Sequence, residues 1–392
     1  MPSFGSETRY LFPFIIEDLQ EKMVFLGGPR QVGKTTLAET LLHNIPGQYY
    51  NWDKLGQRNA ALKGQWAPKS NLIVLDEFHK YKKWKTWLKG EYDTLKGRFK
   101  FLLTGSARLD LYRRGGDSLQ GRYHSYRLHP FSLAEIHALK LQTNPFQPLQ
   151  FRSGHWISDF KMLLRYGGFP EPFVKQNDRH WRRWQQEKIE RLLKEDIRDL
   201  TVIQDVGNLA LLADLLPSKI ASILSINSLA EDLGVNFRTV AHWFDVFEQF
   251  YYCFRIPPYQ TRKVAAVKKE KKLYLWDWSS IKNEGAKLEN MVASHLLKFC
   301  HYLVDVEGYK AELHFLRDST GKELDFLITI DRQPWFAVEV KNHDTQIASS
   351  LYYFKKRLNI PQVYQVTTDE NQDYEKKGIR VMPASQFLTG LV

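Results

Sequence analysis

The sequence contains little cysteine: Cys253 and Cys300 are the only two among 392 residues. Two thiols cannot form a disulfide framework, so the reducing cytoplasm is the expected location. No apolar run approaches the ~20 residues that a membrane-spanning helix requires. The segment Met1–Gln20 also lacks the basic region and apolar stretch of a secretory signal. A cytoplasmic protein with no membrane partner is therefore predicted.

Several signatures of other protein classes are also missing. No group of His and Cys residues has zinc-site spacing, no Ser-His-Asp arrangement is recognisable, and there is no internal repeat or low-complexity tract. What remains is a globular composition, with 43% hydrophobic and 26% charged residues. Because a single core rarely grows to this chain length, we expect two or three domains.

Acidic residues are in deficit. The 56 Lys and Arg residues against 44 Asp and Glu residues give a formal charge of +12. Such a surplus attracts nucleic acid, because binding to phosphates releases counterions. General solubility is the alternative explanation, and a membrane surface is a weaker one, since no basic amphipathic anchor helix stands out.

The hydrophobic pattern predicts an α/β fold in three parts. Residues 1–150 alternate helical stretches with short apolar strands, which is typical of a parallel sheet. The strands are expected at Met23–Leu26, Leu72–Leu75 and Phe101–Leu103. The polar, Pro-containing segment Gln142–Pro148 indicates a linker.

The rest of the chain contains two further segments with different hydrophobic patterns. Residues 151–265 are predicted to be mostly helical, and residues 266–392 to form a second, smaller α/β domain. That domain combines a helix over Ala286–Phe299 with strands over Leu324–Ile330 and Trp335–Val340. The charge run Lys268–Lys272 is expected in a turn before it.

A glycine-rich loop follows the first predicted strand and precedes a predicted helix, Thr35–Leu42. It fits the pattern G-x-x-x-x-G-K-[ST] in full: Gly28, Pro29, Arg30, Gln31, Val32, Gly33, Lys34 and Thr35, with Thr36 next. Glycines let backbone N–H groups surround phosphate oxygens, and the helix N-terminus adds partial positive charge. The loop therefore predicts an ATP site, where Lys34 contacts the β- and γ-phosphates and Thr35 binds Mg²⁺. A chance match in a turn is the alternative.

Two carboxylates end the second predicted strand, Leu72–Leu75. Open α/β sheets bind ligands at the carboxyl ends of their strands. We therefore expect Asp76 to hold the Mg²⁺ shell and Glu77 to polarise the attacking water. The alternative is that these residues only cap the next helix.

The third predicted strand ends in hydroxyl residues. Thr104 and Ser106 are both candidates to orient the water or sense the γ-phosphate, with ordinary turn chemistry as the alternative. Arg122 is a candidate for the arginine that neutralises transition-state charge, often supplied by a neighbouring subunit. Its competitors are Arg108, Arg113 and Arg114.

Five segments together resemble a known family. They are Gly28–Thr36, Leu75–Lys80, Leu103–Ala107, Leu128–Leu133 and Gly167–Glu171. They look like segments of the prokaryotic AAA+-type ATPases that carry a C-terminal domain of unknown function. The resemblance implies an AAA+-like core over residues 1–150, a helical lid and winged helix over 151–265, and a restriction-endonuclease-like tail over 266–392.

Residues 228–244 are predicted to form two helices around a glycine turn. Gly234 supplies the positive φ of the turn, and Asn236 caps the second helix. That helix would expose Arg238, Thr239 and His242 to a DNA groove, and the basic segment 262–272 would form a wing. Because only one arginine is exposed, backbone binding is favoured over base reading. A protein-packing module is the alternative.

Near the C-terminus, Asp325 precedes Glu339 and Lys341, which share one face of a strand. This spacing resembles the PD-(D/E)xK nuclease fold, with Glu289 as the acidic residue of its first helix. In that interpretation Glu289, Asp325 and Glu339 bind Mg²⁺, and Lys341 orients the attacking water. The alternatives are a solvated strand face, or the same fold used to bind DNA without cutting it.

Two runs interleave basic and aromatic residues, His79–Lys89 and His180–Trp184. Bases could stack on such aromatics, but a helix packing its aromatic face on the core is slightly favoured for the first run. The favoured function is an ATP-driven, homo-oligomeric protein acting on duplex or branched DNA, with Mg²⁺-dependent cleavage left open. The rivals are a DNA remodeller or translocase with an inert nuclease fold, and a signalling or scaffold NTPase that binds protein.

Overall fold

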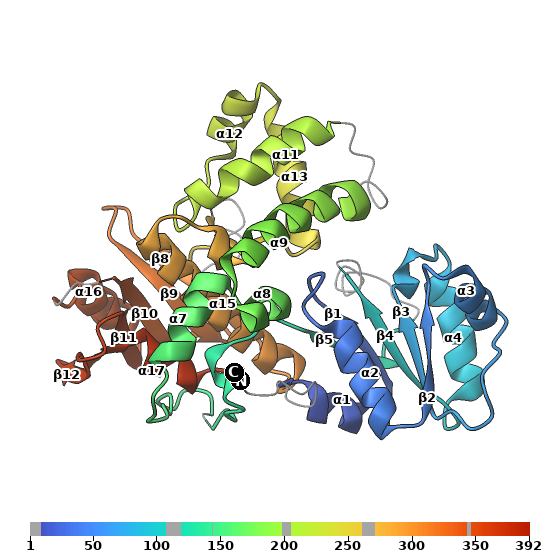
Figure 1. The fold of residues 1–392 in the computed structure, drawn as a ribbon. Coiled ribbons are helices and arrows are strands. Elements are labelled where there is room, and N and C mark those ends of the chain that lie inside the picture. Colours follow the sequence, from blue (N-terminus) through green and yellow to red (C-terminus); the bar gives the residue numbers. More distant parts are fainter. Residues whose placement is uncertain (1–8, 107–118, 143, 198–204, 261–270, 343–345) are drawn as a thin grey trace. The chain divides into compact units, whose positions relative to one another are not determined.

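The computed structural model describes residues 9–106, 119–142, 144–197, 205–260, 271–342 and 346–392. The chain divides into two compact units, Met1–Pro130 and Phe131–Val392 (Figure 1). The three-part division expected from sequence stays a prediction. Among the described helices, none combines the length and apolar character that crossing a bilayer requires.

The first unit is a five-stranded parallel sheet in the order β2-β3-β4-β1-β5. Its strands are β1 (Met23–Gly27), β2 (Gly47–Asn51), β3 (Leu72–Asp76), β4 (Lys100–Gly105) and β5 (Tyr123–Arg127). Its helices are α1 (Phe12–Asp18), α2 (Lys34–Asn44), α3 (Leu55–Leu62), the short η2 (Phe78–Lys80) and α4 (Trp84–Leu95). The three predicted strands are confirmed, whereas β2 and β5 were not predicted.

The core strands of this sheet are buried on both faces, because helices cover each side. Figure 1 shows α3 and α4 on one face and α1 and α2 on the other. On the α4 face, buried Trp84 meets Phe25 of β1 edge to face, and Trp87 packs on Phe78. The aromatic residues of the His79–Lys89 run therefore belong to the core, as slightly favoured from sequence.

The second unit begins with helices. They are α6 (Leu133–Ile136), α7 (Ile157–Tyr166), α8 (Pro170–Lys175), α9 (Asp178–Arg191), η3 (Leu192–Ile197), α11 (Val206–Leu215), η4 (Leu216–Lys219), α12 (Ile226–Leu233) and α13 (Phe237–Gln249). The antiparallel pair β6 (Cys253–Ile256) and β7 (Lys272–Leu275) follows. The expectation of a mostly helical segment is confirmed. The expectation of a turn is wrong for Lys272, which begins β7.

A mixed six-stranded sheet completes the second unit, in the order β12-β13-β11-β10-β9-β8. Its strands are β8 (Ala311–Arg317), β9 (Glu323–Ile330), β10 (Gln333–Lys341), β11 (Gln362–Thr367), β12 (Tyr374–Lys376) and β13 (Ile379–Pro383). Its helical elements are η5 (Trp278–Ser280), α15 (Glu284–Asp305), α16 (Ser349–Leu358), α17 (Ala384–Phe387) and η6 (Leu388–Gly390). The long α15, capped by the Asn283 side chain, packs on β7 and β8 and so positions acidic residues beside them.

Candidate functional site

The glycine-rich loop lies between β1 and α2, at the carboxyl edge of the parallel sheet. Gly28 has φ +151°, and a Cβ added there would lie 2.5 Å from the Leu128 carbonyl oxygen. Gly33 has φ +98° and precedes α2, whose first turn receives no side-chain cap. Only glycine satisfies both positions, and the uncapped N–H groups of α2 are available to an anion.

Two cations hold the loop in shape. The buried Lys34 ammonium donates to the carbonyls of Gly28, 2.9 Å away, and Pro29, 2.7 Å away. From outside the motif, the buried Arg9 guanidinium donates to the carbonyls of Val32 and His129, both at 2.6 Å. Sequence reasoning missed Arg9, because nothing in its local pattern distinguishes it from a surface arginine.

Asp76 ends β3 and is buried. Its two carboxylate oxygens accept hydrogen bonds from the hydroxyls of Tyr49 on β2 and Thr104 on β4. Burial and the bond to Asp76 raise the pKa of Tyr49, and a hydrogen bond with Thr35 partly opposes that rise. Thr35 and Asp76 thus lie close to the same phenol, and their hydroxyl and carboxylate oxygens are the hard donors that suit Mg²⁺.

Tyr49 was missed because the strand that carries it, β2, was not recognised. The adjacent aromatic residues Tyr49 and Tyr50 after a Pro-Gly pair were the available signal, because aromatic residues are enriched in strands. Asn51, two residues on and therefore on the same face, places its amide nitrogen 3.4 Å from Asp76 Oδ2.

Glu77 follows in a strained backbone conformation, with φ +54°. Its N–H donates to the Thr104 carbonyl at 3.0 Å, and its carboxylate lies 3.5 Å from His79 Nε2. Burial raises the pKa of Glu77, and the Lys34 charge partly lowers it. A carboxylate with a raised pKa beside the loop has the character of a proton acceptor.

Of the remaining predicted residues of this unit, Ser106 lies at the same edge of the sheet as the glycine-rich loop, whereas Arg122 does not. Ser106 lies buried directly after β4, at the same edge as Asp76. Arg122 instead precedes β5, whose far end, Arg127, pairs with Gly27. One strand length, roughly 16 Å, separates it from the loop of its own chain. Its guanidinium pairs with Asp93 at 2.8 and 3.0 Å. A role toward a neighbouring copy stays a prediction, and the competitors 108, 113 and 114 lie outside the described residues.

In the second unit, the predicted acidic residues come together around a lysine that sequence reasoning had not assigned to them. We define the acidic cluster as Glu289, Glu323, Asp325 and Glu339. The ammonium of Lys272 lies 2.5 Å from Glu323 Oε1, 3.4 Å from Asp325 Oδ1 and 3.6 Å from Glu289 Oε1. The Lys272 side chain is only 2% exposed. Lys341 contacts Glu339 at 2.8 Å.

Electrostatics in this cluster follow from burial and crowding. Burial and the Asp325 charge raise the pKa of Glu289 to about 8, with Lys272 opposing. Burial and Asp325 likewise raise the pKa of Glu339 to about 7, with Lys341 opposing. Burial would lower the pKa of Lys272, but the surrounding carboxylates outweigh it and the net shift is upward. Lys272 is therefore a fixed positive charge.

The acidic cluster does not fit the predicted Mg²⁺ site. Within the described ranges, no group of three or more His, Cys, Asp or Glu side chains could hold a metal ion. The structure does bring Glu289, Asp325 and Glu339 near one another, but the cation among them is an ammonium of the chain itself.

The predicted helix-turn-helix spacing is confirmed by α12 and α13. Gly234 ends α12 with φ +65°, and the Asn236 side chain accepts from the Thr239 N–H. On α13, Arg238 and His242 are exposed, but so is Asp245. The basic segment expected as a wing lies, over residues 262–270, outside the described residues.

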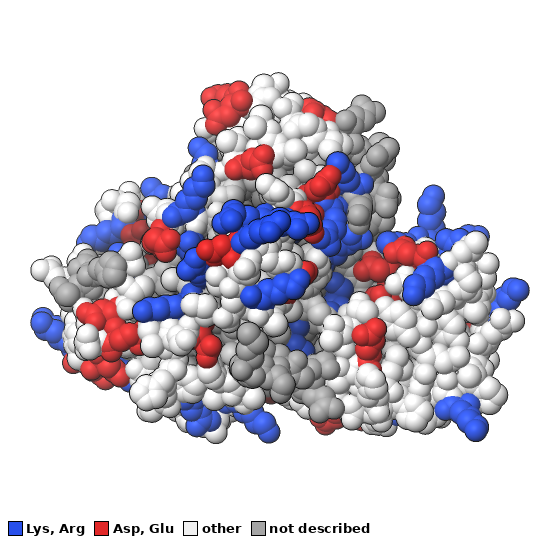
Figure 2. Space-filling view, viewed as in Figure 1, with Lys and Arg blue, Asp and Glu red and all other residues white. Residues whose placement is uncertain are grey.

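Helix α9 holds the aromatic residues of the run His180–Trp184 against the rest of the unit and exposes the arginines of the run. Trp184 is buried, and the Trp181 indole donates to Ser279 Oγ at 2.9 Å. Arg179, Arg182 and Arg183, which we call the arginine face, are exposed. Figure 2 shows Lys and Arg side chains gathered over this helix. Because Trp184 is a core residue and Trp181 is held against η5, neither ring is presented for base stacking.

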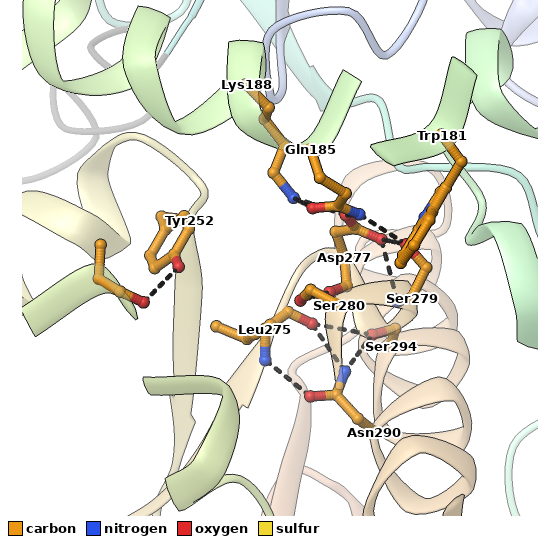
Figure 3. A network of polar contacts seen from close by, with 11 residues as sticks. Trp181, Gln185, Lys188, Tyr252, Leu275, Asp277, Ser279, Ser280, Asn290 and Ser294 are labelled. Atoms are coloured by element: carbon orange, nitrogen blue, oxygen red, sulfur yellow. Dashed lines mark hydrogen bonds and ion pairs between the residues drawn. The ribbon is translucent and has the colours of Figure 1, made fainter. Parts of the chain in front are cut away.

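Helix α9 is anchored by Asp277, next to η5 (Figure 3). The buried Asp277 carboxylate accepts from Lys188 at 2.5 Å and from Gln185 at 2.6 Å. Gly167 makes room for it: a Cβ there would lie 2.7 Å from Asp277 Oδ1. The segment Gly167–Glu171, one of the five that resemble the family, therefore has a structural role in this unit.

The segment Leu128–Leu133, another of those five, has a structural role as well. Ser132 caps α6 by accepting from the Glu135 N–H, and its hydroxyl also accepts from Lys298 of α15 at 2.8 Å. Lys298 and Glu135 form an ion pair whose side chains are each 2% exposed. This pair fixes the start of the second unit to its longest helix.

Three parts of the chain match known domain families. Residues 20–137 match a family described as an AAA domain, and residues 157–283 and 284–387 match two families each described as a domain of unknown function. Uncharacterized proteins of Mycobacterium bovis and Mycobacterium tuberculosis are each 22% identical over 384 residues, covering 94% of this chain and 81% of the relative.

Two solved structures are similar at a low level. A RuvB variant from Thermotoga maritima has a TM-score of 0.33 at 16% identity, over 63% of this chain and 89% of its own. A signal-transduction ATPase with numerous domains from Pyrococcus horikoshii has a TM-score of 0.23 at 14% identity, over 76% of this chain and 47% of its own. Likeness at these scores does not define the fold. The match of residues 20–137 to the AAA domain family nevertheless supports an ATPase of the AAA type in this part of the chain.

Proposed function

We propose that this protein binds ATP with Mg²⁺ at the loop Gly28–Thr36 and hydrolyses it. The observation that carries the proposal is the loop itself: two glycines at positive φ, one of them without room for a Cβ, a buried lysine folded over them, and Asp76 at the same sheet edge. Bound Mg²⁺ would neutralise phosphate charge there, held by Thr35 and Asp76.

Each side chain then has a distinct task. The loop N–H groups and the α2 N-terminus bind phosphate oxygens. Lys34 leaves the Gly28 and Pro29 carbonyls to contact the β- and γ-phosphates. Glu77 orients the attacking water and accepts its proton, helped by a raised pKa. Thr104 is engaged with Asp76, so Ser106 is the better candidate to sense the γ-phosphate.

Calorimetry and a phosphate-release assay test this proposal. Lys34→Ala is expected to abolish ATP binding and turnover. Glu77→Gln should keep binding and lower turnover at least ~100-fold, since general-base catalysis contributes about 10²–10⁴-fold. Lys69→Ala, at an exposed lysine just before β3, is the matched control and should behave like wild type. Unchanged binding in Lys34→Ala would contradict the assignment.

We also propose that the second unit binds the backbone of duplex or branched DNA through the arginine face. All three arginines are exposed, and the Asp178 carboxylate that interacts electrostatically with Arg182 already pairs with Arg165, so phosphate has access to the arginine face. The winged-helix interpretation of α12, α13 and the β6–β7 hairpin would add backbone contacts rather than base reading, because Arg238 and Asp245 share the exposed face of α13.

Fluorescence anisotropy on linear and four-way DNA, over a range of salt, tests the arginine face. Replacing its three arginines by Ala should weaken binding and reduce the slope of log K against log salt by about 2.7, at ~0.9 per phosphate contact. The control replaces three exposed lysines of the C-terminal sheet region, Lys310, Lys356 and Lys376, and should change the slope less. Equal losses would refute a defined DNA face.

ATP turnover that DNA leaves unchanged, together with no DNA binding, would favour the scaffold alternative, in which the second unit binds protein. We further propose a homo-oligomer in which an arginine from a neighbouring copy completes each ATP site. Sedimentation with and without ATP tests this: a chain that stays monomeric under both conditions while hydrolysing ATP would exclude it.

A further inference from the structure

The acidic cluster of the second unit carries its own cation. Lys272 Nζ lies within 3.6 Å of Glu323, Asp325 and Glu289, and the fourth carboxylate, Glu339, interacts with the backbone N–H of Asp325 at 3.4 Å. The ammonium therefore occupies the space between the acidic side chains of α15 and β9. A buried lysine surrounded by carboxylates is stable in its charged form.

Three contacts fix the strand that carries this lysine. The Asn290 side chain of α15 accepts from the Leu275 N–H and donates to the Leu275 carbonyl, both at 2.7 Å (Figure 3). Tyr274 donates to Glu289 at 2.8 Å. Lys272 itself pairs with Ile256 in the β6–β7 ladder. Because β7 is held in register against α15, the Lys272 backbone stays beside the acidic cluster, and the side chain, only 2% exposed, is enclosed there.

A divalent cation and this ammonium compete for the same oxygens. Mg²⁺ requires oxygen ligands at about 2.0–2.1 Å, in near-octahedral geometry. An ion bound by Asp325 and Glu289 would lie close to Lys272 Nζ, where like charges repel strongly in a poorly hydrated site. The carboxylates that would offset the dehydration of the ion are already neutralised by the lysine.

We propose that Lys272 takes the place of the divalent metal in this domain, so that the acidic cluster is a metal-free joint between the β6–β7 hairpin and the C-terminal sheet. The domain accordingly does not cleave DNA. Removing the ammonium converts the same carboxylates into a divalent-cation site. The proposal stands independently of ATP hydrolysis in the first unit.

Mn²⁺ titration of the nucleotide-free full chain, followed by electron paramagnetic resonance, tests the proposal. Wild type should show no site at this cluster, whereas Lys272→Ala should gain one, with affinity at least ~100-fold higher. Adding Asp325→Asn to that variant should abolish the gain. Lys271→Ala, at the neighbouring and more exposed lysine, is the matched control and should gain nothing.

Two results would overturn the proposal. One is a wild-type Mn²⁺ site that Asp325→Asn removes, or Mg²⁺- or Mn²⁺-dependent DNA cleavage by wild type that the same substitution abolishes. The other is a folded Lys272→Ala protein, judged by circular dichroism, that gains no site. Lys272→Met, which keeps most of the side chain's apolar stem, replaces the alanine variant if that one unfolds.

Discussion

The attachment of α9 to Asp277 allows a quantitative test of how the arginine face is held. The Asp277 and Lys188 side chains are 4% and 18% exposed, and their charged atoms lie 2.5 Å apart. Asp277→Ala removes the anion and leaves the Lys188 ammonium without it. Breaking a buried pair in this way costs about 3–5 kcal/mol.

For Asp277→Ala we expect a loss of stability at the lower end of that range, about 3 kcal/mol. Lys188 retains some access to water, and Gln185 keeps its bond to Ser279 at 2.8 Å when the carboxylate is gone. A loss of about 3 kcal/mol corresponds to a roughly 100-fold increase in local opening, since every 1.4 kcal/mol is tenfold.

Native-state hydrogen exchange of the α9 amides measures this opening directly, without requiring the two units to unfold together. Glu187→Gln, which removes an exposed pair with Arg191 on the same helix, is the control and should change exchange less than ~5-fold. Exchange in Asp277→Ala that rises no more than in this control would refute the reasoning. A variant with Lys188→Met and Asp277→Leu together should lose less stability than Asp277→Ala, because no buried charge is left unpaired.

The same pair predicts a pH dependence. Burial raises the pKa of Asp277, but Lys188 and the other donors outweigh it, and the net pKa lies below the ordinary 3.8. The folded state therefore binds this proton less tightly than the unfolded state. The stabilisation is fully present above pH ~4 and is lost as pH falls through the depressed pKa. The protection factors of the α9 amides, which divide out the intrinsic pH dependence of amide exchange, should thus fall in acid for wild type and change less with pH in the double variant.

Three further outcomes are expected. Gly28→Ala should weaken ATP binding at least ~10-fold in calorimetry, because its Cβ would lie 2.5 Å from the Leu128 carbonyl oxygen and the loop must shift. The acid limb of the ATPase pH profile should lie above pH 4.5, because burial raises the pKa of Glu77 and its ionised form is the acceptor; a limb at or below 4.5 would contradict this. Lys298→Met should lower the free energy of unfolding in urea by about 3–5 kcal/mol, because it removes the ammonium that pairs with buried Glu135.

Matched controls accompany these variants. Gly56→Ala lies in α3, where an added Cβ meets nothing within 4 Å, so ATP affinity should not change. Combining Lys298→Met with Glu135→Gln should recover part of the stability lost in Lys298→Met alone. A double variant less stable than Lys298→Met would show that the ion pair is not the source of the loss.

The local sequence determined the parts of the ATP site that are contiguous. The run Gly28–Thr35 places both glycines, the lysine and the start of α2 in one loop, because each requirement is met within eight residues. The strand ending at Asp76 could be predicted for the same reason: a short, fully apolar run has few alternatives to a buried parallel strand. The turn at Gly234 and the cap at Asn236 are equally local, and both were predicted.

The tertiary structure alone decided which distant groups meet. Arg9 donates to a loop carbonyl 23 residues away in the sequence. The Tyr49 hydroxyl donates to Asp76 from an adjacent strand, and the sequence did not reveal that these two strands pair. Lys272 lies in a basic run typical of a solvated turn, yet it is buried 53 residues before Asp325. A charge pattern is read along the chain, whereas the free energy of a buried charge depends on the partners that folding brings to it through space, and these were not visible in the sequence.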